Sequence, residues 1–288
     1  MPRPGRRSAA GRRKAVAQLI ATAQKETGHY YLPTGEPCHG DLRQARKQKA
    51  YPSPTTIMGA VLARPGLDNW KQENAILQCM TTPRLDGETD ADFARRVVAG
   101  SKGDLQAAAD RGTYVHQLSE AAVNGTDPGN LQDGLQPHWQ SLKYWARFVQ
   151  KVHKCEEVVV NHDEGYAGRV DLICEWGDKH EQTTEVVDFK TRKFKKIGKL
   201  IPDMPGHATH DEPHKVDSYD TDIIQLAAYA YAVFDEPVAA RSVYIDPTTG
   251  AIENKLWTPE EVEAAYDIFC KTLAIWRWMK KYDPRASK

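Results

Sequence analysis

The segment Glu185-Val-Val-Asp188-Phe-Lys190-Thr191 decides the fold expected of this chain of 288 residues. Its β-branched and apolar residues predict a strand, in which Asp188 and Lys190 point to one face while Val187 and Phe189 point to the other. A carboxylate and an ammonium on one strand face can act together. The carboxylate then holds a divalent cation, and the lysine orients a water molecule or stabilises negative charge on a phosphate. A solvated surface pair is the alternative, and it is the commoner one for such a segment taken alone.

A second acid interrupts the preceding predicted strand. In Gly165-Tyr-Ala-Gly168-Arg-Val-Asp171-Leu-Ile173, Asp171 stands in an otherwise apolar run, 17 residues before Asp188. This spacing suits a hairpin in which the two carboxylates meet across adjacent strands. Converging carboxylates repel unless a cation lies between them, and oxygen ligands favour Mg²⁺ or Mn²⁺. The alternative is an edge-strand aspartate paired with Arg169.

Two predicted helices carry further polar pairs. His116 and Glu120 are four residues apart and share one helix face, although a lone helical histidine is usually a core or capping residue. Gln225 and Tyr229 have the same spacing in a second helix. Gln225 lies in the most apolar run of the chain, where an unsatisfied amide is costly, so it needs a polar partner. That partner is either a metal–phosphate site or another buried polar group.

Hydrophobic periodicity and turn residues set the expected element order. The predicted helices are 14–26, 57–62 (with a capped start at Ser53-Pro54-Thr55-Thr56), 67–80, 90–99, 104–124, 136–153, 220–234 and 259–281. The predicted strands are 157–161, 168–175 and 184–190, which form a meander, and 241–246. We expect 28–54 and 194–219 to be irregular. The order predicts an α/β fold with a small central mixed sheet flanked by helices. The expected regions are a disordered basic tail (1–14), a helical and irregular N-terminal region (15–102) and the core (103–288).

Composition excludes several classes of protein. With 40% hydrophobic and 27% charged residues the chain is typical of a soluble globular protein, and its most apolar run, Ile223–Phe234, is too short to cross a membrane. Five widely spaced cysteines without a CxxC pair suggest neither a zinc site nor a disulfide framework, so we expect reduced thiols in a cytoplasmic protein. The net charge of zero conceals a balance of +8 in residues 1–50, which hold 11 Lys/Arg and 3 Asp/Glu.

The motifs resemble, in order, those of the PD-(D/E)XK nucleases of the RecB-like branch, which includes phage-type exonucleases and the mitochondrial genome maintenance exonuclease. The matching motifs are His116, Gly168-Arg-Val-Asp171, Asp188-Phe-Lys190 and Gln225-Leu-Ala-Ala-Tyr229, within a span of 111–246. The segment Ser53-Pro54-Thr55-Thr56 is similar to one found upstream in phage members. Val170-Asp171 replaces the familiar Pro-Asp. The cysteine quartet of the iron–sulfur members is missing, so no iron–sulfur cluster is expected.

The resemblance implies a restriction-endonuclease-like core and assigns roles to its residues. One or two Mg²⁺ or Mn²⁺ ions would be held by His116, Asp171, Asp188 and the backbone carbonyl of Phe189. Lys190 would position the attacking water, Gln225 would hold Lys190 or a phosphate oxygen, and Tyr229 would brace its helix against the site. Glu120 would orient water or a ligand from farther out.

The charge pattern fits a nucleic-acid substrate. Six basic residues and no acid lie in Lys190–Lys199, and we expect this run to follow a DNA backbone, a solvated loop being the alternative. The residues concerned, besides Lys190, are Arg192, Lys193, Lys195, Lys196 and Lys199. Ten acids and two basic residues lie in the stretch from Glu156 to Asp188, and we expect a divalent cation to neutralise part of this excess negative charge. His207, His210 and His214 lack partners at zinc-type spacing.

These features predict a metal-dependent DNA exonuclease that serves phage or bacterial replication, recombination or repair in the cytoplasm of a bacterium or an infected host. Its expected partners are DNA with a free end and a recombination or single-strand-binding protein, without a membrane. A structure- or sequence-specific endonuclease on the same core is one alternative. A catalytically idle nuclease-fold module that binds DNA is another.

Overall fold

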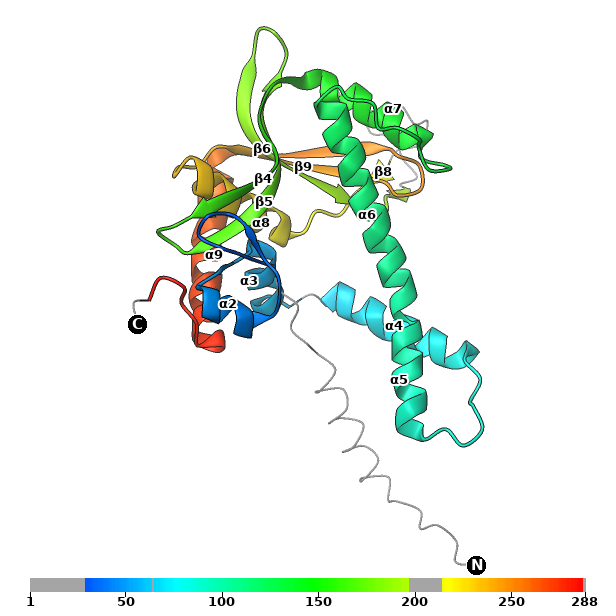
Figure 1. Ribbon diagram of the computed structural model, residues 1–288. Helices are drawn as coiled ribbons and strands as arrows, with labels where there is room; N and C mark the ends of the chain where they lie inside the picture. Colours follow the sequence, from blue (N-terminus) through cyan, green and yellow to red (C-terminus); the bar gives the residue numbers. More distant parts are fainter. Residues whose placement is uncertain (1–28, 64, 197–213, 287–288) are drawn as a thin grey trace, which may run out of the picture. The chain divides into compact units, whose positions relative to one another are not determined.

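A computed structural model describes residues 29–63, 65–196 and 214–286 (Figure 1). The basic tail, the helix expected over 14–26, Lys199, His207 and His210 lie outside the described residues. The chain divides into two compact units. Of the described residues, the first unit contains 63 and 65–109, and the second contains 29–62 and 110–286. Residues 29–62, which we expected in the N-terminal region, therefore belong to the unit that carries the core.

A five-stranded mixed sheet forms the centre of the second unit, with the strand order β10-β9-β6-β5-β4. The strands are β4 (Val149–Asn161), β5 (Tyr166–Gly177), β6 (Gln182–Thr191), β9 (Ala239–Ile245) and β10 (Ile252–Trp257). Strands β4, β5 and β6 form the predicted antiparallel meander, and β9 runs parallel to β6. The mixed α/β class and the central sheet are thus confirmed.

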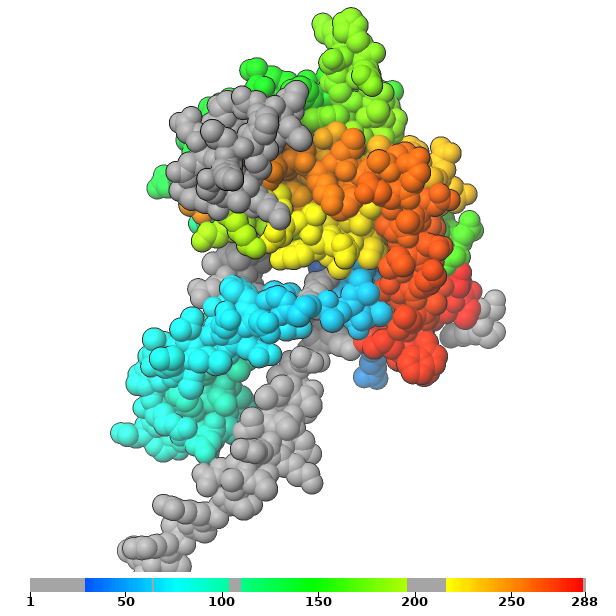
Figure 2. All heavy atoms as spheres, turned by 180° about the vertical axis from the view of Figure 1, so that it is seen from behind, coloured from blue at the N-terminus to red at the C-terminus, as the bar shows by residue number. Residues whose placement is uncertain are grey.

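Helices cover both faces of this sheet (Figure 1). On one face, α3 (Pro54–Val61), α8 (Asp220–Val233) and α9 (Pro259–Lys280) share a large apolar cluster with β5 and β6. On the other, the second-unit part of α6 (Lys102–Val123) and α7 (Gln136–Trp145) bury a second cluster with Val187 and Phe189 of β6. Figure 2 shows α9, in orange to red, along the outside of this unit. Among the described residues, no helix has both the length and the hydrophobicity needed to cross a membrane.

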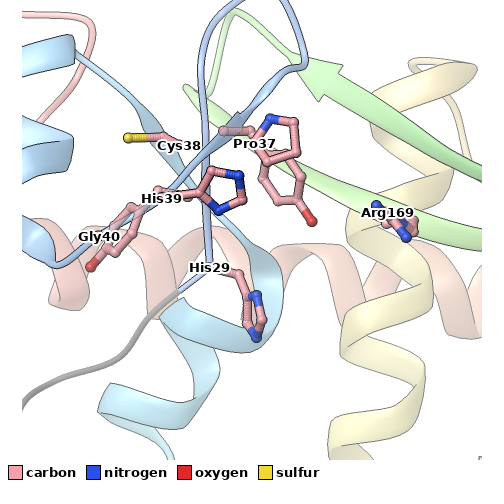
Figure 3. Close-up of a pocket in the computed structure, with 8 residues that line it drawn as sticks. His29, Pro37, Cys38, His39, Gly40 and Arg169 are labelled. Atoms are coloured by element: carbon pink, nitrogen blue, oxygen red, sulfur yellow. The ribbon is translucent and has the colours of Figure 1, made fainter. Parts of the chain in front are cut away.

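The segment 29–52 is more ordered than its composition suggested. It forms a small sheet of β1 (Tyr30–Tyr31), β2 (Pro37–Cys38) and β3 (Tyr51–Pro52), with helix α2 (Leu42–Gln48) between the last two strands. The expectation of irregular chain is wrong here, because strands of two residues leave no periodic signal while the buried Tyr30 and Tyr31 hold them against β5. This sheet also borders a pocket beside Arg169 (Figure 3).

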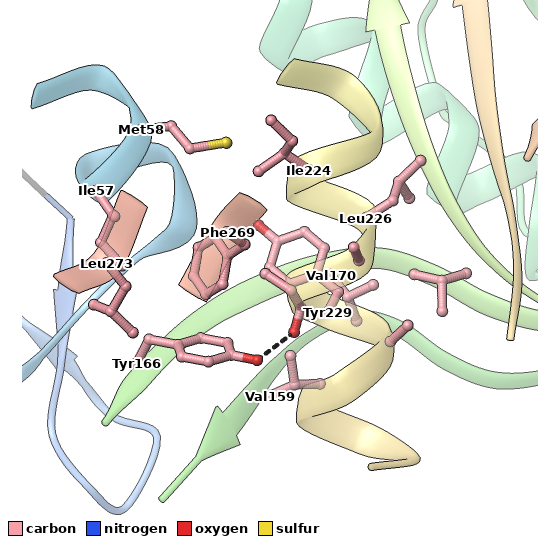
Figure 4. Packing of buried hydrophobic residues seen from close by; sticks show 14 of the residues in the cluster. Ile57, Met58, Val159, Tyr166, Val170, Ile224, Leu226, Tyr229, Phe269 and Leu273 are labelled. Carbon is pink, nitrogen blue, oxygen red and sulfur yellow. Dashed lines mark hydrogen bonds between the residues drawn. The ribbon is translucent and has the colours of Figure 1, made fainter. Parts of the chain in front are cut away.

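The apolar cluster around α8 fixes that helix against the sheet (Figure 4). Tyr166 of β5 is fully buried, stacks edge-on to Phe269 of α9 at 4.8 Å, and donates a hydrogen bond of 2.8 Å to the carbonyl of Ala228. Ile57 of α3 and Leu226 of α8 are likewise fully buried. Since α8 carries Gln225 and Tyr229, this packing fixes where their side chains contact the sheet.

Local signals explain where the predicted helices begin. The Ser53 hydroxyl accepts a hydrogen bond of 3.1 Å from the Thr56 amide and Pro54 opens α3, as the capped start predicted. Helix α9 starts with a capping box between Thr258 and Glu261.

The helix expected over 136–153 is too long. Helix α7 stops at Trp145, a short 3-10 turn (η1, Ala146–Phe148) follows, and β4 begins at Val149. Trp145 and Phe148 pack on Trp176 of β5, with ring centroids 4.5 and 5.4 Å apart, so tertiary contacts end the helix where periodicity alone would continue it. Strand β10 was not predicted from the sequence. Strands β7 (Lys195–Lys196) and β8 (His214–Lys215) pair at the two ends of the expected loop.

The first unit contains α4 (Pro65–Thr81), α5 (Asp90–Gly100) and the start of α6. Both predicted helices are confirmed. Arg96 joins Glu88 through two hydrogen bonds of 3.0 and 2.9 Å, which closes the loop before α5. Val97 is buried, whereas no residue of α4 is.

Candidate active site

The register of β5 and β6 places the two predicted aspartates opposite each other. Leu172 pairs with Val187, so the next antiparallel pair is Asp171 with Asp188. The Phe189 amide donates a hydrogen bond of 2.7 Å to Asp171 Oδ2, which ties that carboxylate to β6. The hairpin expected from the spacing of the two acids therefore brings them together. Phe189 joins the site through its amide N–H, and a role for its carbonyl stays a prediction.

Lys190 and Gln225 meet on Asp188. The Lys190 ammonium donates to Asp188 Oδ1 at 2.8 Å and to Gln225 Oε1 at 3.2 Å, while Gln225 Nε2 donates to Asp188 Oδ1 at 3.1 Å. The amide in the most apolar run of the chain thus has its polar partners at the predicted site. Asp188 is 1% exposed, so removal of either donor would leave a buried carboxylate poorly satisfied.

Tyr229 supports this arrangement from one turn farther along α8. Its hydroxyl accepts a hydrogen bond of 3.3 Å from Gln225 Nε2. Its ring lies against β5 at Gly168, where a Cβ atom would come within 2.8 Å of Tyr229 Cε1. The glycine of the Gly168-Arg-Val-Asp171 motif therefore allows α8 to approach the sheet closely.

His116 and Glu156 complete a three-residue cluster with Asp171. His116 Nδ1 lies 3.6 Å from Glu156 Oε1 and 3.5 Å from Asp171 Oδ2. One potential ligand atom from each residue lies within 4.8 Å of the other two, so the cluster could hold a metal ion. Both distances from the imidazole are longer than a good hydrogen bond. The three side chains are therefore close enough to share a metal ion, but the imidazole is not hydrogen-bonded to either carboxylate.

Glu156 was missed because it stands just outside the strand predicted over 157–161. The neighbouring pairs Cys155–Leu172 and Glu157–Val170 put it opposite Asp171, with a left-handed φ of 52° at the residue itself. Extending the predicted hairpin register outward by one residue would have found it. Glu156, Asp171 and Asp188 thus form one row across β4, β5 and β6.

The donor set fits a divalent cation. One imidazole nitrogen and two carboxylates suit Mn²⁺, and the carboxylates alone suit Mg²⁺. Asp188 Oδ2 is buried and accepts no well-aligned hydrogen bond from the described residues, although the Lys190 ammonium lies 2.7 Å away. The lysine ammonium is therefore the cationic partner of this oxygen among the described residues.

Burial and crowding of acids perturb the titration of the site. Burial, and after it the charge of Asp188, raises the pKa of Asp171 to about 7. Burial alone would lower the pKa of His116, but Glu156 and Asp171 outweigh it and the pKa is raised. The same opposition holds at Lys190, where Asp188 and Asp171 overcome burial and raise the pKa. Burial raises the pKa of the Tyr229 hydroxyl well above its usual value. The site therefore favours bound positive charge, as protons or as a cation.

The remaining predicted residues are not among the three residues of this cluster. Glu120 is exposed and lies one helical turn from His116. Burial of the Cys155 thiol on β4, and after it the negative charge of Glu120, raises the pKa of Cys155 to about 11. Arg192 donates to Asp222 at 3.0 Å and its guanidinium lies 4.1 Å from the ring centroid of Tyr219, so it is engaged within the fold.

Other members of the basic run are more accessible. Lys193 is exposed, and Lys195 is exposed and paired with Asp217. Lys196 belongs to β7, but its side chain is outside what the structure describes.

The arrangement combines a candidate cation site, a buried Asp–Lys–Gln group and acids that call for positive charge. Such groups can bind an anionic ester through a cation and hold a water molecule beside it. No known protein-family model and no curated protein matches the chain, so its activity has to be inferred from this geometry.

Proposed function

We propose that this protein is a metal-dependent nuclease that hydrolyses phosphodiester bonds in DNA on a restriction-endonuclease-like core. The observation that supports this most is the meeting of Asp171 with Asp188 across β5 and β6, beside the His116–Glu156 pair. The Lys190–Gln225 contact on Asp188 adds the cationic group that phosphate chemistry needs.

The residues of the site divide into two groups with different roles. His116, Glu156 and Asp171 would hold the ion. Bound there, Mg²⁺ or Mn²⁺ supplies charge neutralisation of the phosphate and lowers the pKa of a coordinated water. Asp188 and Gln225 fix the Lys190 ammonium, which orients the water and stabilises negative charge that develops on the phosphate.

DNA with a free end is the proposed substrate, and the exposed Lys193 and Lys195 after β6 favour it because they can contact a backbone phosphate beside the site. A recombination or single-strand-binding protein is the proposed partner. We place the activity in phage or bacterial DNA replication, recombination or repair, in the cytoplasm.

Asp188→Asn and Lys190→Ala test the proposal. Linear end-labelled and closed circular DNA would be incubated with Mg²⁺, Mn²⁺ or EDTA. We expect the wild type to degrade linear DNA only with metal, and each variant to lose activity by on the order of 10²-fold or more, since a positioned group of this kind contributes that much. Asp267→Asn and Lys271→Ala are matched controls, because this exposed pair on α9 is 3.3 Å apart with side chains 76% and 69% exposed.

Wild-type rates in both site variants would refute the proposal. Cleavage of closed circles would indicate the endonuclease alternative on the same site. Metal-independent DNA binding without products from any substrate would indicate the idle module.

A further inference from the structure

A pocket of about 510 Å³ lies between the small N-terminal sheet and β5. Its wall includes His29, Cys38 and His39 from the N-terminal segment and Arg169 from β5. Figure 3 shows the imidazoles of His29 and His39 on one side of this space and the Arg169 guanidinium on the other. None of the described residues that line the pocket is an acid. A half-enclosed space lined by one cationic side chain and no carboxylate attracts anions.

The Arg169 guanidinium has N–H donors that no other described residue uses. Its side chain is 52% exposed, and its Nη1 lies 3.8 Å from Glu156 Oε2, a loose ion pair. Its guanidinium makes no hydrogen bond to another of the described residues, although the group carries five N–H donors in a planar fork. Arg241, by contrast, is committed to Glu185 through two hydrogen bonds of 2.6 and 2.8 Å. Arg169 is therefore available to a ligand in the pocket.

The pocket adjoins the metal cluster. Arg169 stands two residues before Asp171 on β5, and Glu156, its ion-pair partner, is one of the three candidate ligands. A group held by Arg169 would thus be linked to the candidate cation site through Glu156, although none of the three candidate ligands lines the pocket itself. Bidentate contact by arginine is the common protein solution for a phosphate group, with imidazole N–H groups as additional donors.

We propose that this pocket binds a phosphate group of the DNA strand being cut, with Arg169 as its charged contact and His29 and His39 as hydrogen-bond donors. The inference rests on the nuclease function proposed for the adjoining cluster. The phosphate is either the terminal one at a strand end or an internal one of the backbone, and both present the same oxygens to Arg169.

Equilibrium binding in EDTA tests the pocket without cleavage. The probes are one fluorescein-labelled DNA duplex with a 5′-phosphate and the same duplex with a 5′-hydroxyl, measured by anisotropy over a series of salt concentrations. We expect Arg169→Gln to weaken binding by about tenfold, the loss of one charge-assisted contact, and to reduce the slope of log K against log salt by about one. His39→Ala should weaken binding less, and Arg95→Gln on α5 is the matched arginine control.

If Arg169→Gln loses affinity only for the 5′-phosphorylated duplex, the bound group is a terminal phosphate. If the variant loses affinity equally for both duplexes, the bound group is an internal phosphate. Wild-type affinity and salt slope in both Arg169→Gln and His39→Ala overturn the proposal, as does a wild-type protein that binds neither duplex. Failure of the nuclease proposal looks different, since it leaves binding intact and yields no product with Mg²⁺ or Mn²⁺.

Discussion

Gly168 shows how one residue sets the distance between α8 and strand β5, which carries Asp171. A Cβ there would lie 2.8 Å from Tyr229 Cε1 and 3.0 Å from Pro54 Cδ. We expect Gly168→Ala to push Tyr229 away from Gln225 and to lower the free energy of unfolding by about 1–3 kcal/mol, the usual cost of overpacking. Urea denaturation measures the stability. The cleavage rate should fall with it, because Gln225 loses the hydroxyl that supports it.

Gly112→Ala is the matched control for this substitution. Gly112 lies inside α6, and a Cβ there would meet Thr191 Oγ1 at 3.5 Å, an ordinary contact. Alanine should leave the stability unchanged or raise it by up to about 1 kcal/mol, since glycine is the poorer helix former. Equal losses in the two variants would show that close approach to Tyr229 is not the cause.

Several site residues could be predicted because their chemistry conflicts with their surroundings. Asp171 and Gln225 are polar residues in apolar runs, and each needs a partner that the fold supplies. Glu156 carries no such conflict, because it stands just before the predicted strand and beside another acid, Glu157. Its place in the cluster depends on β4 continuing past the predicted start. The pairing of Arg192 with Asp222 could not be predicted from the sequence, since it depends on the position of α8.

At the scale of elements, Asp246 joins the end of β9 to the chain that follows β6. Its carboxylate accepts hydrogen bonds from the amides of Phe194 at 2.8 Å, Thr248 at 2.9 Å and Thr249 at 2.8 Å. Burial would raise its pKa, but these amides outweigh burial and the pKa is lowered. A lowered pKa means that the carboxylate stabilises the fold at pH values above its unfolded pKa of about 4. This stability is lost as the pH falls through the folded pKa.

Asp246→Asn should therefore destabilise the protein by about 1–3 kcal/mol at pH 7, because the amide NH₂ leaves a buried N–H without an acceptor. The difference from the wild type should begin to shrink as the pH falls below the unfolded pKa of about 4, and it should be lost once the pH passes the lower folded pKa, where the native carboxylate is protonated. Urea unfolding at pH 7 and pH 3 measures both values. Asp267→Asn on the exposed face of α9 should change neither, and a wild-type-like Asp246→Asn at pH 7 would contradict the expectation.

Elements with local signals were predictable, and those defined by tertiary contacts were not. Helices α3 and α9 begin at capping residues that the sequence displays. Strand β10 has charged residues at Glu253 and Lys255 and lies at the sheet edge, where one side of the strand has no neighbour to impose a pattern. The end of α7 at Trp145 depends on the Trp176 ring of a strand 31 residues later in the chain.

At the scale of the whole molecule, the two units differ in how much they bury. Helix α4 of the first unit has no buried residue and exposes Ile76, Leu77 and Met80, each by 60% or more. Helix α8 of the second unit has nine buried residues. Length does not explain the contrast, because α4 has 17 residues and α8 has 14. The hydrophobic contribution to stability is therefore concentrated in the second unit.

Hydrogen exchange followed by mass spectrometry should resolve this difference. Local opening costs anything from about zero up to the global free energy of unfolding, roughly 5–15 kcal/mol, and the cost follows the apolar burial of the segment. We expect amides of α4 and α5 to exchange faster than those of α8 and β6 by on the order of a hundredfold or more. Helix α9 is the internal control, because it is exposed on one side yet anchored by buried residues such as Phe269 and Trp276, and it should exchange as slowly as α8. Equal protection of α4 and α8 would mean that the two units unfold as one, against the distribution of their buried residues.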